Sequence, residues 1–304
     1  MGKETHRVTT MTTISYLLLV AVLLLVDLSS PSLAWGEEGH YATCALAEKF
    51  FSNATMGAVK DLLPDYAGGS LASLCSWPDE MRFKYRWSSS LHFIDTPDFK
   101  CNYNYDRDCH DSQDVKGRCA AGAINNYTSQ LTSFFSASQQ YNLTEALLFL
   151  AHIVGDIHQP LHVGFSSDLG GNTIKVHWYK HIANLHHVWD SSIIVTANER
   201  FYNSSTNTLV ESIGQNIMQG YRNHEIDEWR SCPSDDLACP DIYAAESIKA
   251  ACKWAYKNAT PGTFLADDYF LTRMPIVEMR LAQGGVRLAA ILNRIFSQGQ
   301  VHTS

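Results

Sequence analysis

One strongly apolar stretch of this chain, residues 146–157, carries a histidine and an aspartate, and it constrains the fold more than any other feature. The preceding Asn142-Leu-Thr-Glu145 is typical of a capping box, so we predict that a helix begins there. His152 and Asp156 are four residues apart and therefore project from one face, one turn apart. Apolar neighbours bury this helix, and a buried aspartate is costly unless it is paired or bound to a metal.

Two interpretations of this pair are open on spacing alone. A histidine and a carboxylate so arranged can bind one divalent metal, or they can form a buried hydrogen bond that holds a core together. A second pair favours the metal, because His186 and Asp190 are also four residues apart. His187 lies three residues before Asp190, so spacing does not decide which of these two histidines would be the ligand.

The first 34 residues have the pattern of a secretory leader. A positively charged start is followed by an apolar run over residues 14–26 and by a small-x-small cleavage pattern that ends at Ala34. The apolar run is short for a transmembrane helix, although a signal anchor is the alternative interpretation. We therefore expect residues 1–34 to be a signal peptide and residues 35–304 to form one mature domain.

All eight cysteines lie in the mature part, which agrees with secretion because disulfides persist in oxidising compartments. An even count suggests four disulfides, and Cys109 with Cys119 and Cys232 with Cys239 are the local candidates. No C-x-x-C pair occurs, which disfavours a thiolate zinc site. Five N-x-S/T sequons favour glycosylation and begin at Asn53, Asn126, Asn142, Asn203 and Asn258.

Helical patterns dominate the mature part and predict one mostly α-helical domain. Helices are expected over 184–197, 244–256 and 276–296, with an interruption of the last at Gly284-Gly285, a short strand over 176–179, and disulfide-stapled loops over 96–117 and 232–240. The formal net charge of −8 argues against a broad duplex-binding surface. It does not exclude a polyanion bound at a local positive site.

Further candidate ligands lie before the apolar helix. Asp79 follows a proline, where we expect the chain to be irregular, and His92 precedes Phe93. Cleavage after Ala34 would expose the amino group of Trp35, five residues before His40. Plain core packing is the alternative interpretation for these aromatic side chains.

Six motifs occur in one order along the chain: Trp35-Gly-x-x-Gly-His40, Trp77-Pro-Asp79, His92-Phe93-x-Asp95, His152-x3-Asp156-x-His158-Gln-Pro-Leu-His162, Gly170-Gly171-Asn172 and Asn184-Leu-His186-x3-Asp190. This series resembles the plant bifunctional nuclease (nuclease I) family, which is similar to secreted fungal zinc nucleases that cut single strands. The resemblance implies an all-α fold related to the trizinc bacterial phospholipases C and stapled by disulfides.

The resemblance also implies three zinc sites and a set of disulfides. The first zinc would take Asp79, His92, His152 and Asp156, the second His162, His186 and Asp190, and the third the amino and carbonyl groups of Trp35 with His40 and Asp156. The implied disulfides are Cys44–Cys75, Cys101–Cys252, Cys109–Cys119 and Cys232–Cys239. His158 would not be a ligand. Nitrogen and oxygen ligands without thiolates suit catalytic zinc.

The implied chemistry is phosphodiester hydrolysis of single-stranded DNA and RNA to 5′-phosphorylated products. Water activated between the first two zinc ions would attack phosphorus in line, with Asp79 orienting it and Arg82 stabilising the phosphate and the departing 3′ oxygen. Phe93 would stack on a base while Asp95 and Asn172 hydrogen-bond its edge, which is free only in an unpaired strand. The same pocket could accept 3′-mononucleotides, which would make the protein a 3′-nucleotidase as well.

Two rival functions remain at this point: a trizinc phospholipase C acting on lipid headgroups, and a non-catalytic metal-binding or storage glycoprotein. The Phe93 and Asp95 pocket argues against the first, and Arg82 has no role in the second. No protein partner is implied, so we expect a monomer. The leader sends the protein into the secretory pathway, with the extracellular space or the vacuole as its destination.

Overall fold

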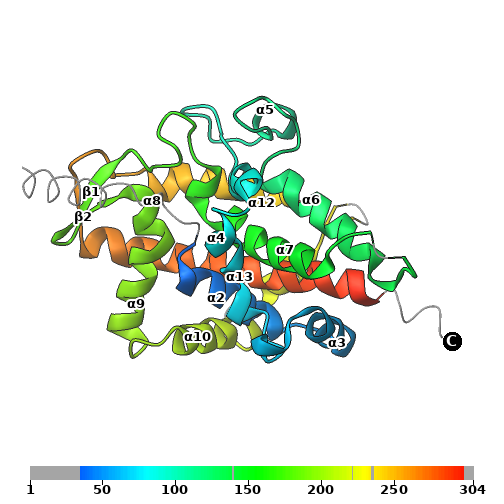
Figure 1. Ribbon diagram of the computed structural model, residues 1–304. Helices are drawn as coiled ribbons and strands as arrows, with labels where there is room; N and C mark the ends of the chain where they lie inside the picture. The colour runs from blue at the N-terminus through cyan, green and yellow to red at the C-terminus, as the bar shows by residue number, and fades with distance from the viewer. Residues whose placement is uncertain (1–34, 139, 221, 234–235, 298–304) are drawn as a thin grey trace, which may run out of the picture. The chain divides into compact units, whose positions relative to one another are not determined.

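The computed structural model describes residues 35–138, 140–220, 222–233 and 236–297, so the expected signal peptide lies outside the described residues. Helices account for most of this part (Figure 1), which confirms the predicted fold class. The α-helices are α2 (Glu37–Glu48), α3 (Asn53–Leu62), α4 (Trp77–Met81), α5 (Tyr105–Asp108), α6 (Ala120–Leu131), α7 (Leu143–His158), α8 (Leu185–His187), α9 (Ile193–Phe201), α10 (Thr206–Met218), α11 (Ile226–Arg230), α12 (Pro240–Ala250) and α13 (Asp267–Ser297).

Shorter elements connect these helices. The 3₁₀ turns are Asp65–Ala67, Ala72–Leu74, η4 (Arg86–His92), Thr132–Phe135, η6 (Pro160–Val163) and Asn223–Glu225, and the π-helical turns are η7 (Val188–Ser192) and η9 (Ala251–Ala255). A small sheet contains β1 (Lys175–Trp178), β2 (His181–Asn184) and β3 (Phe264–Leu265). Its strand order is β2-β1-β3, with β1 antiparallel to β2 and parallel to β3. The predicted strand is therefore one of three.

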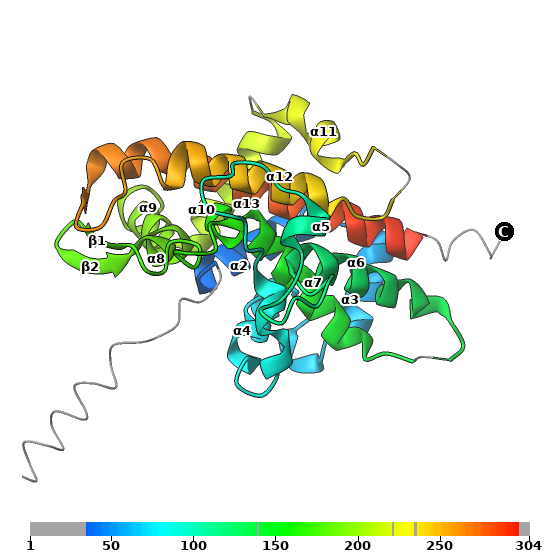
Figure 2. The same cartoon turned by 90° about the horizontal axis from the view of Figure 1, so that it is seen from above.

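Helix α7 forms where the sequence predicts it. The Asn142 side chain accepts a hydrogen bond from the Glu145 backbone amide at 3.2 Å, which caps the first turn. The helix ends at His158, before Pro160, whose ring cannot continue it. Almost every residue of α7 is buried, because α2, α6, α12 and α13 pack around it (Figure 2). This helix is the centre of the core, and it carries the first histidine–aspartate pair.

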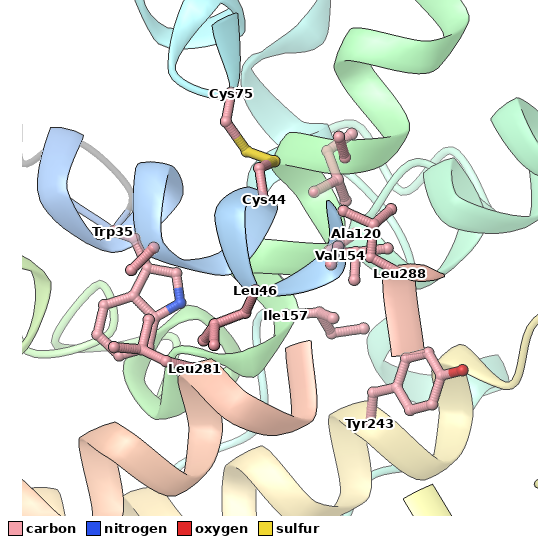
Figure 3. Close-up of a cluster of buried hydrophobic side chains, with 14 of the residues drawn as sticks. Trp35, Cys44, Leu46, Cys75, Ala120, Val154, Ile157, Tyr243, Leu281 and Leu288 are labelled. Atoms are coloured by element: carbon pink, nitrogen blue, oxygen red, sulfur yellow. A yellow bond between two sulfur atoms is a disulfide. The ribbon is translucent and has the colours of Figure 1, made fainter. Parts of the chain in front are cut away.

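The long helix α13 corrects one expectation. It runs unbroken through Gly284 and Gly285, where we expected an interruption. A β-carbon on Gly285 would lie 2.6 Å from the Cβ of Leu46 on α2, so the glycine allows two helices to approach closely. Figure 3 shows Leu46 beside Leu281 of α13 in the interior. Tertiary packing explains these glycines better than helix breaking does.

The structure joins all eight cysteines in four disulfides: Cys44–Cys75, Cys101–Cys252, Cys109–Cys119 and Cys232–Cys239. Figure 3 shows the first of them connecting α2 to the segment before α4. The predicted loop over 96–117 is irregular apart from the single turn of α5. Among the described residues, none of the helices combines the length and the apolar character that a membrane span requires.

Candidate metal centre

Asp156 lies at the middle of a buried group of histidines, and its two carboxylate oxygens face different neighbours. Its Oδ2 is 3.0 Å from Nδ1 of His92 and 3.3 Å from Nε2 of His152. Its Oδ1 is 3.2 Å from Nε2 of His40. The side chain has no exposed surface. This arrangement allows one carboxylate to contribute one oxygen to each of two metal sites.

The first site is completed by Asp79. This residue lies in the first turn of α4, so the irregular backbone expected after the proline is wrong: Pro78 occupies an early helical position where its missing amide costs nothing. The Asp79 Oδ1 is 3.6 Å from Nε2 of His152 and 3.9 Å from Nδ1 of His92. The neighbouring elements α4 and η4 and the distant helix α7 therefore place the four residues expected at the first zinc together.

The second neighbour of Asp156 is the segment from Trp35 to His40. Helix α2 begins at Glu37 with Gly36 as N-cap, and the His40 amide donates to the Gly36 carbonyl at 3.1 Å. Trp35 is fully buried, and its side chain packs beside Gly39, where a β-carbon would lie 2.9 Å from Trp35 Cβ. The His40 ring stacks on that of His152 at 3.7 Å. The backbone of Trp35 is thus held in the first turn that carries His40.

A third group contains His162, His186 and Asp190. The Nε2 atoms of His162 and His186 are 3.2 Å apart, and Asp190 Oδ2 is 3.4 Å from His186 Nε2. The residues come from η6, α8 and the π-helical turn η7. His186 is buried in this group whereas His187 is exposed, so the structure distinguishes two histidines that spacing did not.

Backbone carbonyls fix the orientation of three of these histidine rings. Taken as Nδ1–H tautomers, His152 donates to Cys75 O at 2.8 Å, His162 to His92 O at 2.7 Å and His186 to Gly170 O at 2.6 Å. Each Nε2 then points into the cluster, where that of His152 lies 3.1 Å from Nδ1 of His92. Metal-binding histidines usually have such a partner on the second ring nitrogen.

The charge state of the cluster favours cations. Burial opposes the charged form of His152, but Asp156 and Asp79 outweigh it and raise its pKa to about 10. Burial and His152 lower the pKa of His40 to about 4, and burial and His162 lower that of His186 to about 3. The lowered pKa values keep His40 and His186 neutral, which is the form of imidazole that binds metals. The raised pKa of His152 shows that Asp79 and Asp156 stabilise a positive charge beside that ring, and a metal ion bound there would replace its proton.

Several buried polar atoms in this cluster have no hydrogen-bond partner among the described residues. They include both ring nitrogens of His40, Nε2 of His92 and Oδ1 of Asp156. Buried polar groups are rarely left without a partner, because each one costs about 1–3 kcal/mol. In each of the three groups the ligand atoms lie within 4.8 Å of one another, so bound metal ions fit the donors that are present.

Comparison with known proteins agrees with this geometry. Residues 35–297 match the sequence model of the S1/P1 nuclease family. The chain belongs to the S1/P1 nuclease family. It is 56% identical to endonuclease 4 of Arabidopsis thaliana over 92% of this chain and 95% of the relative. It is also 32% identical to nuclease S1 of Aspergillus oryzae and 30% identical to nuclease P1 of Penicillium citrinum, covering 87% and 86% of this chain and 92% and 97% of those relatives.

The family membership confirms the expected resemblance and makes the protein a nuclease, a hydrolase that acts on nucleic acids. S1/P1 nucleases are metal-dependent, and three candidate metal groups are present in the described part of this one. Its disulfides fit an extracellular protein.

The residues expected to bind substrate lie beside the metal groups of this S1/P1 nuclease. Phe93 follows His92 and is 37% exposed, and burial raises the pKa of Asp95, opposed by His110. Ile94 between them donates its amide to the His162 carbonyl at 2.7 Å. The segment from His92 to Asp95 therefore runs directly alongside the ligands.

Asn172 and Arg82 lie at two other places around the centre. Asn172 is half-buried, and its Nδ2 donates to Leu169 O at 2.9 Å. It lies two residues after Gly170, whose carbonyl accepts a hydrogen bond from the His186 ring. Arg82 directly follows α4, and its guanidinium lies 4.8 Å from the Phe83 ring.

Gln159 is a residue of this centre that sequence reasoning missed. Its side chain is fully buried; Nε2 donates to Asp190 Oδ1 at 2.5 Å, and Oε1 accepts from the Leu161 amide at 2.5 Å. It therefore ties the end of α7 to a candidate ligand on η7. A signal was present, because Gln159 lies between two expected ligands, Asp156 and His162.

Proposed function

We propose that this S1/P1 nuclease is a zinc-dependent endonuclease that hydrolyses single-stranded DNA and RNA to 5′-phosphorylated products and also acts as a 3′-nucleotidase. The observation that carries the proposal is the divided Asp156 carboxylate, with one oxygen toward His92 and His152 and the other toward His40. Together with the group around His186, it supports three metal positions around one substrate phosphate.

The donor set favours zinc. All the candidate side-chain ligands are imidazole nitrogens or carboxylate oxygens, and every cysteine is in a disulfide. Such ligands suit a catalytic zinc site with an open position. When bound, the ions would activate water and neutralise phosphate oxygens.

The polypeptide would contribute positioning and charge. Asp79, which is half-buried, would accept a hydrogen bond from the attacking water and hold it in line with phosphorus. Arg82 would donate two parallel hydrogen bonds to the phosphate and stabilise the departing 3′ oxygen, since a guanidinium is permanently charged.

Selection of unpaired strands would come from the base pocket. Phe93 offers a partly exposed ring for stacking, which any base can use. Asp95 and Asn172 would bond the base edge, which is occupied by the partner strand in a duplex. Because any base can stack on Phe93, the enzyme would not require a particular base sequence.

Maturation is part of the proposal. Removal of residues 1–34 in the secretory pathway would free the amino group of Trp35 as a metal ligand beside His40. The five sequon asparagines are exposed, as acceptors of glycans must be: Asn53, Asn126, Asn142, Asn203 and Asn258. We expect a monomeric glycoprotein outside the cell or in the vacuole.

The deciding experiment compares secreted protein that begins at Trp35 with a form that carries one extra N-terminal alanine. We expect the extension to remove one tightly bound zinc by elemental analysis and to reduce single-stranded DNA cleavage sharply. A form extended by one alanine at the C-terminus is the matched control. Full zinc content and activity in the N-terminally extended form would exclude the terminal ligand.

Substrate class is tested separately with denatured DNA, RNA, duplex DNA, 3′-mononucleotides and phosphatidylcholine. We expect cleavage of the unpaired nucleic acids and of the 3′-mononucleotides. Hydrolysis of phosphatidylcholine without cleavage of denatured DNA or RNA would instead establish the phospholipase function.

A further inference from the structure

The three-stranded sheet presents an aromatic and aliphatic row to solvent. In the register of the sheet, His177 on β1 pairs with Ile182 on β2 and with Phe264 on β3. Ile182 is 76% exposed and Phe264 71% exposed. The rings of His177 and Phe264 are stacked, with centroids 4.2 Å apart and planes 7° from parallel. The three side chains therefore form one continuous flat patch, which we call the sheet row.

The opposite face of the sheet is ordinary core. Val176, Trp178 and Leu265 are buried, and the Trp178 ring packs edge-on against Tyr269 and Phe270 of α13. The outer face has no such cover in the described part of the chain. Single exposed apolar side chains need no explanation. Here two of them, Ile182 and Phe264, flank the half-buried His177, whose ring stacks on Phe264, and together they form a surface that can bind a flat partner.

The sheet is continuous with the metal centre. Strand β2 ends at Asn184, two residues before the candidate ligand His186, and the Leu185 amide donates to Ile174 O at 2.9 Å. The His186 amide in turn donates to Gly171 O at 3.4 Å. Both views show β1 and β2 beside α8 (Figures 1 and 2).

One positive charge lies on β1 between the metal centre and the sheet row. Lys175 is exposed and, two residues before His177, lies on the same face of β1; in the register it pairs with Asn184, two residues before His186. Lys180, in the turn between β1 and β2, is also exposed but lies at the opposite end of the hairpin from Asn184. In a chain with a formal net charge of −8, the exposed Lys175 gives this face a local positive charge that can pair with a phosphate.

We propose that the sheet row is a second binding surface for single-stranded nucleic acid, for nucleotides beyond the one at the metal centre. Phe264 and His177 would stack with a base, Ile182 would pack against it, and Lys175 would pair with a backbone phosphate. This inference rests on the proposed function and deepens it, because it predicts that binding improves with strand length.

The test compares KM for an unpaired twelve-nucleotide strand and for a dinucleotide. We expect the double variant His177→Ala, Phe264→Ala to raise KM for the twelve-nucleotide strand relative to KM for the dinucleotide roughly fivefold or more, because base stacking is lost. Phe135→Ala is the matched control, because it removes an exposed ring, 53% accessible, from a distant 3₁₀ turn. Thermal unfolding verifies that each variant is folded.

A binding measurement without catalysis gives a second readout. The affinity of the intact holoenzyme for a hydrolysis-resistant phosphorothioate strand is followed by fluorescence anisotropy at several salt concentrations. Lys175→Ala should reduce the slope of log affinity against log salt by about 0.7, the value for one phosphate contact on a single strand.

Failure of this inference is distinguishable from failure of the proposed function. If wild-type protein cleaves neither substrate, the proposed function is wrong. If it cleaves both and the double variant keeps the wild-type ratio of KM values, only the sheet row proposal is overturned. It is also overturned if sedimentation shows that the double variant breaks a dimer while strand affinity stays the same, because the row would then bind a second copy.

Discussion

Two buried polar clusters lie along the C-terminal half of α7, and they differ in how their atoms are partnered. In the metal centre, His40, His92 and Asp156 leave buried nitrogen and oxygen atoms without hydrogen bonds. In the second cluster, which we call the arginine cluster, the side chains hydrogen-bond one another; its members are His158, Arg280, Arg287 and Glu246. A cluster whose polar atoms hydrogen-bond one another is structural, whereas buried nitrogen and oxygen atoms without partners are suited to bind an ion.

The arginine cluster holds the end of α7 in place. Arg280 donates to His158 O at 3.1 Å, and Ser247 donates to Ile157 O at 2.5 Å, so carbonyls at the helix terminus gain partners. Burial, with Arg280 and Arg287 nearby, keeps the pKa of His158 well below its ordinary value. His158 is therefore neutral and accepts a hydrogen bond from Arg287 at 3.0 Å.

The largest expected effect comes from Asp156→Asn. Loss of one carboxylate damages two metal sites and removes several kcal/mol of charge stabilisation, so the rate on single-stranded DNA should fall roughly 1,000-fold or more. Elemental analysis and initial rates measure this. Near-normal zinc content together with a near-normal rate would show that Asp156 does not bridge two ions.

Arg280→Met attacks the arginine cluster instead. The change should cost about 1–3 kcal/mol in the free energy of unfolding, because the buried His158 carbonyl loses a partner while the partly exposed Glu246 keeps Arg287. Denaturant unfolding should show this loss of stability both with and without a chelator that removes bound metal. A loss that appears only in the metal-loaded protein would contradict the distinction between the two clusters.

Gln159→Leu should act on the metal centre without removing a ligand. Because Gln159 orients Asp190, we expect metal affinity at one site to fall about 10- to 100-fold. Competition with a chromogenic chelator measures the affinity. Gln283→Leu is a control in the arginine cluster, where the side chain bonds Arg280, and it should leave metal affinity unaltered.

The smallest expected effect is the pH dependence contributed by Glu246. Burial opposes its charge, but Arg287 and Arg280 lower its pKa from 4.5 to about 2. Because the pKa of Glu246 is lower in the folded state, its ionised carboxylate stabilises the folded protein fully above about pH 4.5, and this stabilisation disappears as the pH falls toward 2. The stability difference between wild type and Glu246→Gln should therefore narrow over that interval, as measured by urea unfolding. A difference that stays constant from pH 5 to pH 2 would contradict this origin.

The sequence by itself determined the local features. The Asn142 cap, the apolar character of α7 and the four-residue spacing of His152 and Asp156 predicted a buried helix with a polar pair on one face. These features depend on neighbours within one or two helical turns. For the same reason, the helix from 276 onward was found, although its glycines were misread as an interruption.

Only the tertiary structure decided which groups meet. Asp79 and His152 are brought within 3.6 Å from different elements, and Gln159 meets Asp190 across the core. The arginine cluster had no sequence motif, since its members pair across α7, α12 and α13. Helical periodicity specifies which face a side chain occupies, but the packing of helices distant in sequence specifies what that face contacts.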